Sequence, residues 1–98
     1  MNYLLHPEAE SDLREAAQYY RERAGSALAQ TFLADFEHAI NLLLQHPLIG
    51  ALWLHGKRRV IMQHFPYAVV YTVVAQDIRI LAVAHQNRRP GYWRSRRW

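Results

Sequence analysis

The chain has 98 residues, of which 51% are hydrophobic and 20% are charged, so it has the size and composition of a single globular domain spanning residues 1–98. It contains no cysteine, which excludes a disulfide framework and thiolate chemistry and fits a reducing compartment. The net charge of +4 conceals an asymmetry, because residues 1–50 hold three arginines against seven acids (net −4), whereas residues 51–98 hold nine Lys/Arg against Asp77 alone (net +8). Charge separated in this way steers an anionic partner toward the second half.

No apolar run approaches the roughly 20 residues that a membrane span requires. The first residues do not resemble a signal peptide, because Tyr3-Leu4-Leu5 is followed by His6-Pro7 and then by acids. We therefore expect a cytoplasmic protein that does not contact membranes.

The first part of the chain predicts a strand and a helix. Residues 2–5 form the short strand, and Pro7 suits the first position of the helix that follows. Apolar residues recur at a spacing of 3–4 and give one stripe: Ala9, Leu13, Ala16, Ala17, Tyr20 and Ala24. Gly25 ends this helix. Four of its acids are interpreted as a solvated face: Glu8, Asp12, Glu15 and Glu22.

The second helix has the strongest periodicity in the chain. Its apolar residues fall on one face: Leu28, Phe32, Leu33, Phe36, Ala39, Ile40, Leu43 and Leu44. It begins near Ser26 and ends before Pro47. The link between the two helices is so short that they are expected to form an antiparallel hairpin, with Phe36 and Leu43 in the core.

After Gly56 the pattern changes to that of strands. Residues 57–62, 67–74 and 78–85 form three runs, interrupted by His64-Phe65-Pro66 and by Ala75-Gln76-Asp77. Short links between them predict an antiparallel meander. The fold class is therefore α+β, in the order β-α-α-β-β-β, with the helix hairpin packed on one face of a twisted, mainly antiparallel sheet.

The segment from Arg88 to Trp98 holds five arginines and three aromatic residues and no acid. Like charges this dense cannot all be buried, so we expect the segment to lie on the surface and face a negatively charged partner. Arginine binds phosphate or carboxylate in bidentate fashion, and the aromatic rings of Tyr92, Trp93 and Trp98 can anchor an interface. The simpler alternative is a solvated, frayed end of the chain.

Three features together resemble a known family. They are the order of the elements, the Phe65-Pro66-Tyr67 and Tyr71 pattern of the middle strand, and the segment His85 to Arg94 with its Arg88-Arg89-Pro90 and Tyr92-Trp93. The whole chain resembles the ParE/RelE superfamily of toxins from bacterial type II toxin–antitoxin modules, and the ParE-like (plasmid stabilisation) branch is most similar. The resemblance implies a growth-inhibiting toxin neutralised by a cognate ParD-like antitoxin, which would also provide any contact with operator DNA.

The target that the resemblance implies depends on the branch. RelE-like toxins cut mRNA in the ribosome without a metal, whereas ParE-like toxins are described as inhibitors of DNA gyrase. If the chain were RelE-like, the candidate catalytic residues would be Arg58, His85, Arg89 and Tyr92. Ala68 stands where the nucleases often carry arginine, and this favours gyrase inhibition without enzymatic activity.

The residues expected to bind the target or the antitoxin are mainly basic: Lys57, Arg58, Arg59, Arg88, Arg89, Tyr92, Trp93, Arg94, Arg96 and Arg97. Some candidates have structural alternatives, since Lys57 to Arg59 could protect an edge strand against aggregation, and the candidate catalytic residue His85 could simply bond a loop carbonyl. Cationic neighbours are expected to lower the pKa of Tyr92. No cofactor and no metal is expected, because His46, His55 and His64 match no compact ligand spacing. A general nucleic-acid-binding module is a third possibility.

Overall fold

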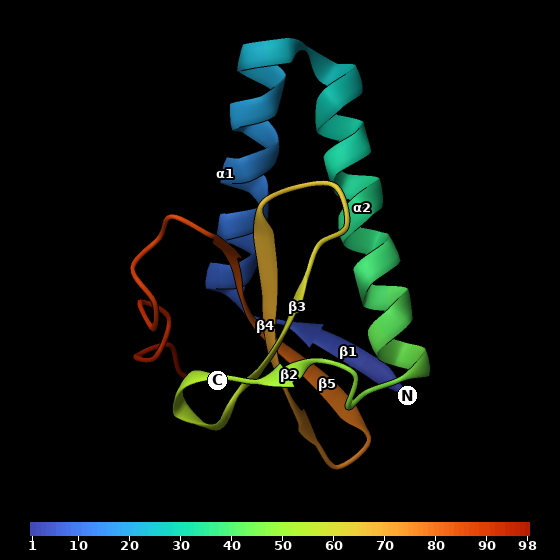
Figure 1. Cartoon of the computed structure of the whole chain (residues 1–98), viewed down its shortest axis with the longest axis vertical. Helices are drawn as coiled ribbons and strands as arrows, with labels where there is room; N and C mark the ends of the chain where they lie inside the picture. Colours follow the sequence, from blue (N-terminus) through green and yellow to red (C-terminus); the bar gives the residue numbers. More distant parts are fainter.

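A computed structural model of the protein describes all 98 residues and shows a helix hairpin packed on one face of a five-stranded sheet (Figure 1). In chain order the elements are β1 (Asn2–Leu5), α1 (Pro7–Ala24), α2 (Ser26–Gln45), β2 (Ala51–Leu52), a 3-10 turn (Leu54–Gly56), β3 (Arg58–Ile61), β4 (Tyr67–Val74) and β5 (Asp77–His85). The predicted order is confirmed. Strand β2 was not predicted, because two residues are too few to show a pattern.

The strands lie in the order β1-β5-β4-β3-β2. Strands β2 to β5 pair antiparallel with their neighbours, which confirms the predicted meander, and β1 pairs parallel with β5. Strand β1 covers only residues 77–80 of β5. The second half of β5 therefore has an edge that no strand occupies.

Local sequence explains where α1 begins and ends. His6 caps its start by accepting a hydrogen bond from the Glu8 N–H to its Nδ1, and Pro7 occupies the first turn. Gly25 ends it with a φ of 92°, in a region that favours glycine. The helices then run antiparallel, and their connection projects well beyond the sheet (Figure 1). No helix is both long and apolar enough to cross a membrane.

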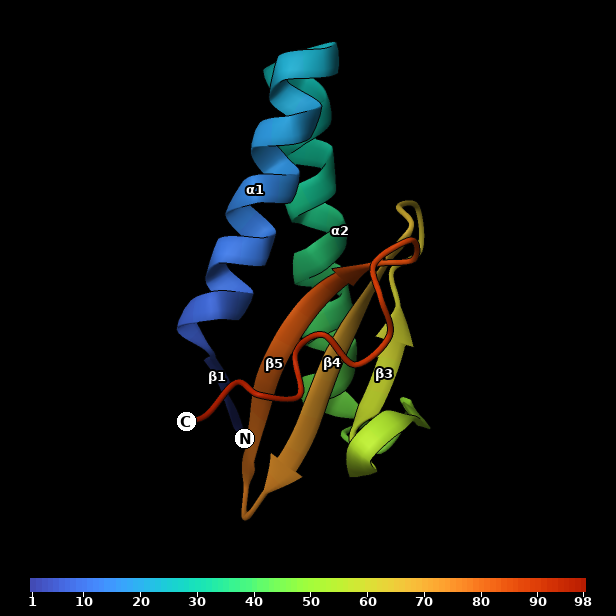
Figure 2. The same cartoon turned by 90° about the vertical axis from the view of Figure 1, so that its left-hand side faces the viewer.

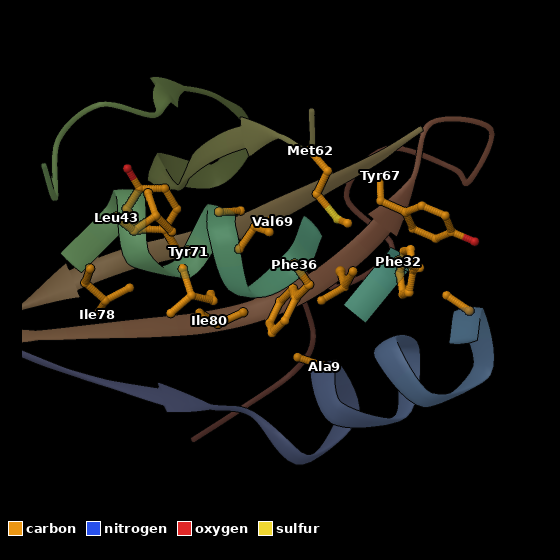
Figure 3. Packing of buried hydrophobic residues seen from close by; sticks show 14 of the residues in the cluster. Ala9, Phe32, Phe36, Leu43, Met62, Tyr67, Val69, Tyr71, Ile78 and Ile80 are labelled. Carbon is orange, nitrogen blue, oxygen red and sulfur yellow. The ribbon is translucent and has the colours of Figure 1, made fainter. Parts of the chain in front are cut away.

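The main core lies between the helices and the sheet. Phe36 and Leu43 of α2 point toward Val69 and Tyr71 of β4 and toward the isoleucines of β5, and Phe32 lies beside Tyr67 (Figure 3). Leu43 has no exposed surface and Phe36 is only 5% exposed, so the prediction that both are core residues is confirmed. Tyr71 also ties the end of α2 to the sheet, because its hydroxyl donates to the Pro47 carbonyl and accepts from the Gly50 N–H.

A second, smaller core lies on the opposite face of the sheet. Between the pairs Val70–Ala82 and Tyr71–Ile80 one residue of β5, Leu81, has no partner, and this bulge shifts the alternation of the strand. Leu81 and Ala82 can therefore both join Val70, Ala84 and the distant Trp93 in one buried cluster. Figure 2 shows the C-terminal segment crossing this face of the sheet, with the helices behind it. We call this face the outer face.

Candidate functional site

The C-terminal segment, residues 86–98, is part of the folded structure. Trp93 has no exposed surface, and its ring packs with Trp53 and His55. Gly91 makes the required turn with a φ of 80°, and a side chain there would meet His55 at 3.3 Å. The expectation that the whole segment lies on the surface is therefore wrong for Trp93, because the outer face of the sheet is apolar and needs a cover.

Asp12 of α1 anchors the segment. Its buried carboxylate accepts two hydrogen bonds from Arg96, at 2.7 and 3.0 Å, and one from the Tyr92 hydroxyl at 3.2 Å. It also accepts the Val83 N–H, while Arg96 donates to the Leu81 carbonyl. These side chains satisfy backbone groups on the part of β5 that β1 leaves uncovered. The interpretation of Asp12 as a solvated acid is therefore wrong. Sequence periodicity could not reveal that Arg96 and Tyr92 bind its buried carboxylate.

Next to Trp93 the outer face has a pocket of about 100 Å³. Ala68 and Ala84, a cross-strand pair, lie at its base, and their small side chains leave the space open. Arg59, Arg88 and Arg89 line the pocket, and no acid does. Two of these arginines stack on aromatic rings: Arg59 lies 4.1 Å from the centre of the Trp53 ring, and Arg88 lies 3.9 Å from the centre of the Tyr92 ring. We call this site the arginine pocket.

Of the other predicted binding residues, Tyr92 and Trp93 line the arginine pocket and the rest do not. Arg58 points away from it and donates to the carbonyls of Leu48 and Gly50, a structural role. Arg96 is bound to Asp12, and Trp93, although it lines the pocket, is buried in the second core. Lys57 is half-buried just before β3, and the remaining two residues are exposed on the segment: Arg94 and Arg97.

Three of the four candidate catalytic residues line the arginine pocket, namely His85, Arg89 and Tyr92, whereas Arg58 does not. Burial, followed by the charge of Asp12, raises the pKa of Tyr92 to about 12. The expected lowering by cations is therefore wrong, because Asp12 and desolvation outweigh the opposing effects of Arg96 and Arg88. His85 was expected to bond a loop carbonyl. Instead, its Nδ1 accepts a hydrogen bond from the Asn87 N–H. No group of three or more His, Asp or Glu residues could hold a metal ion.

Three contributors to the site were missed at the sequence level: Trp53, Ala84 and Asp12. Trp53 precedes the 3-10 turn in a stretch without periodicity, so nothing placed it beside Arg59. The Ala68–Ala84 base depends on strand register, which the sequence alone did not define. A buried acid opposite a basic segment could have been suspected from the excess of arginine, but the sequence offered several acids in α1.

Comparison with known proteins identifies the family. A family model described as the ParE toxin of the type II toxin–antitoxin system parDE matches residues 3–90, so the chain belongs to this family. A solved structure described as a chromosomal ParDE toxin–antitoxin system from P. aeruginosa has the same fold, with a TM-score of 0.77 and 22% identity over 87% of this chain and 95% of that one. No curated protein matches the chain significantly. Most of the segment that carries Trp93 and Arg96 lies beyond the residues matched by the family model.

Proposed function

We propose that the protein is the toxin of a toxin–antitoxin module, that a cognate antitoxin neutralises it, and that it acts by binding DNA gyrase rather than by cutting RNA. Membership of the ParE toxin family supports the first part. The environment of Tyr92 is the observation that favours binding over cleavage.

RNA cleavage through the 2′-hydroxyl requires a base and an acid whose pKa values lie near the working pH. The Tyr92 hydroxyl is bonded to Asp12, and its pKa of about 12 leaves it protonated and unsuited to act as a base. Ala68 adds no cation at the base of the arginine pocket. A surface with fixed cations, on which the Tyr92 hydroxyl stays protonated, is suited to binding.

The alternative is a ribosome-dependent, metal-independent mRNA endoribonuclease. The arginine pocket favours it, because cations around a phosphate would stabilise the charge that develops during cleavage. Both proposals predict growth inhibition, so growth alone does not separate them.

Two assays on the purified protein separate the alternatives. We expect inhibition of DNA supercoiling by gyrase, and unchanged yield and unchanged mRNA ends in a cell-free translation reaction. The Tyr92→Phe variant should behave like the unmodified protein in both. If supercoiling stays normal and new mRNA ends appear only when ribosomes are present, the gyrase proposal is wrong and the protein is a ribosome-dependent nuclease.

The antitoxin is expected to lay an amphipathic segment on the toxin, with acids near Arg59 or Arg89. Arg58 is less suited to this role, because its guanidinium already donates to two backbone carbonyls. The attraction is long-range and screened by salt, so association should slow as ionic strength rises. A rate that stays constant between about 0.05 and 0.5 M salt, over which the Debye length shrinks severalfold, would contradict this steering. Any contact with operator DNA within the complex is expected to come from the antitoxin.

A further inference from the structure

The three cations of the arginine pocket have no anionic partner within the protein. The ion pairs of the chain use Arg14, His64 and Arg96. Arg59, Arg88 and Arg89 form none, although they line one pocket of about 100 Å³. The pocket therefore gathers positive charge that a bound anion would offset.

Stacking has already ordered two of these side chains. Arg59 lies over Trp53 at 4.1 Å and Arg88 lies over Tyr92 at 3.9 Å, and each contact covers one face of a guanidinium. Trp53 is in turn held against the buried Trp93, and Tyr92 is held by Asp12. A stacked guanidinium keeps its N–H edge free for hydrogen bonds. Because the side chain is already ordered, less conformational entropy is lost when a ligand binds.

The chemistry of the pocket fits a phosphate group. Each guanidinium can donate two parallel hydrogen bonds to a phosphate, and a phosphate has enough oxygens for more than one arginine. A carboxylate and a single phosphodiester each carry one charge, but successive phosphodiesters of a strand can pair with more than one of the three cations. The small Ala68–Ala84 base gives the anion room to approach the sheet.

The surroundings favour a phosphate that belongs to a nucleic-acid strand. Further arginines follow the outer face away from the pocket: exposed Arg94 and Arg97 lie on the C-terminal segment, and Arg79 lies beneath Trp98 at 5.7 Å. Most acids of the chain belong to the two helices on the other side of the sheet. A polyanion can therefore continue past the pocket over a basic surface.

We propose that the arginine pocket is a phosphate-binding site by which the toxin itself holds a nucleic-acid strand. The site binds without cleaving and does not depend on which enzyme the toxin inhibits. This inference goes beyond the proposed function and can fail or succeed independently of it.

The test is direct binding of the full chain, without antitoxin, to a fluorescent single-stranded oligonucleotide at several salt concentrations. Arg59→Gln and Arg88→Gln should each weaken binding about tenfold or more, because each removes charge-assisted hydrogen bonds. Arg94→Gln is the matched control, since it removes the same charge from the same basic surface outside the pocket. It should weaken binding only about twofold to threefold. Equal losses in all three variants would show diffuse attraction and overturn the site.

A second variant tests the pocket without changing charge. Ala68→Val fills the base of the pocket with a residue suited to a strand, and it should also weaken binding about tenfold while the far-ultraviolet spectrum stays unchanged. Unchanged binding by this folded variant would contradict the site.

Competitors identify the source of the phosphate. Inorganic phosphate and a 5′-mononucleotide should displace the oligonucleotide only at much higher concentration, because they contact the pocket alone. If the mononucleotide competes as tightly as the strand, the assignment to nucleic acid is wrong. If an acidic peptide competes as well as an unlabelled strand of equal charge, the pocket does not select phosphate and the proposal fails.

Discussion

Asp12 and Arg96 are 84 positions apart in the sequence and form a two-point ion pair, in which two guanidinium nitrogens lie 2.7 and 3.0 Å from the two carboxylate oxygens. Both side chains are nearly buried, with exposed fractions of 7% and 11%. Burial alone would lower the pKa of Arg96, but its hydrogen bonds and attraction to Asp12 raise the pKa above its usual value. The pair joins the C-terminal segment to α1 and closes the open edge of β5.

Removing Asp12 should destabilise the protein strongly. Asp12→Ala leaves the largely buried Arg96 with only the exposed Glu8, 3.4 Å away, as an ionic partner, and breaking a buried pair costs roughly 3–5 kcal/mol. Urea unfolding followed by far-ultraviolet circular dichroism measures the change. The matched control is Glu10→Ala, which breaks an exposed ion pair between Glu10 and Arg14 on the same helix. This change should cost under about 1 kcal/mol. Equal effects of the two substitutions would contradict the anchoring role of Asp12.

Trp93 should contribute to folding, not only to binding. Trp93→Ala empties a fully buried site and is expected to cost about 3–5 kcal/mol. Trp93→Phe should cost much less, because the indole N–H makes no hydrogen bond that phenylalanine would lose. Trp98→Ala, at a side chain that is half exposed, is the control and should leave the melting temperature nearly unchanged. A melting temperature that does not respond to Trp93→Ala would place Trp93 outside the core.

Deletion of residues 92–98 should destabilise the fold even more than the substitution of Trp93. The last strand predicted from the sequence ends at His85, so the sequence alone predicts that removal of residues 92–98 leaves the fold intact. The structure leads to the opposite prediction, because the deletion removes Trp93 from the second core and Arg96 from Asp12. Loss of toxicity in such a truncated chain would therefore not identify a binding surface.

The sequence was sufficient to predict the helix hairpin and the meander. The stripe containing Phe36 and Leu43 repeats the period of a helix, and the run of β4 is rich in the β-branched and aromatic residues that strands favour. The second core was not predictable in the same way. It depends on the bulge at Leu81 and on contacts between Trp53 and Trp93, which join short irregular segments without periodicity.

The distribution of charge in the sequence predicted where the basic surface lies, but it did not predict the role of each arginine. Arg59, Arg88 and Arg89 do lie together, as a basic surface would require. Arg58 and Arg96, which look equivalent in the sequence, instead bond backbone carbonyls and a buried acid. Neighbouring strand residues point to opposite faces, so the alternation along β3 separates Arg58 from Arg59.

High pH should destabilise the protein through its buried tyrosines. Burial raises the pKa of Tyr67 and of Tyr92 to about 12, whereas an unfolded tyrosine titrates near 10. The unfolded chain therefore loses these protons first, so the stabilisation is complete below about pH 10 and is lost as pH rises toward 12. Tyrosinate absorbance measures the titration, and Tyr92→Phe should remove one late-titrating group. A titration curve unchanged by this substitution would show that Tyr92 is not protected.

The central claim, a toxin that acts by binding, is tested most directly by growth arrest with the Tyr92→Phe variant. Induced expression of the unmodified protein without its antitoxin should slow bacterial growth, and co-expression of the antitoxin should restore it. The phenylalanine variant keeps the ring beneath Arg88 and loses only the hydroxyl, so it should arrest growth at the same expression level. If the hydroxyl were a general acid or base, the reaction rate would fall on the order of 10²–10⁴-fold. Normal growth of cells that contain folded, soluble Tyr92→Phe protein would contradict the account.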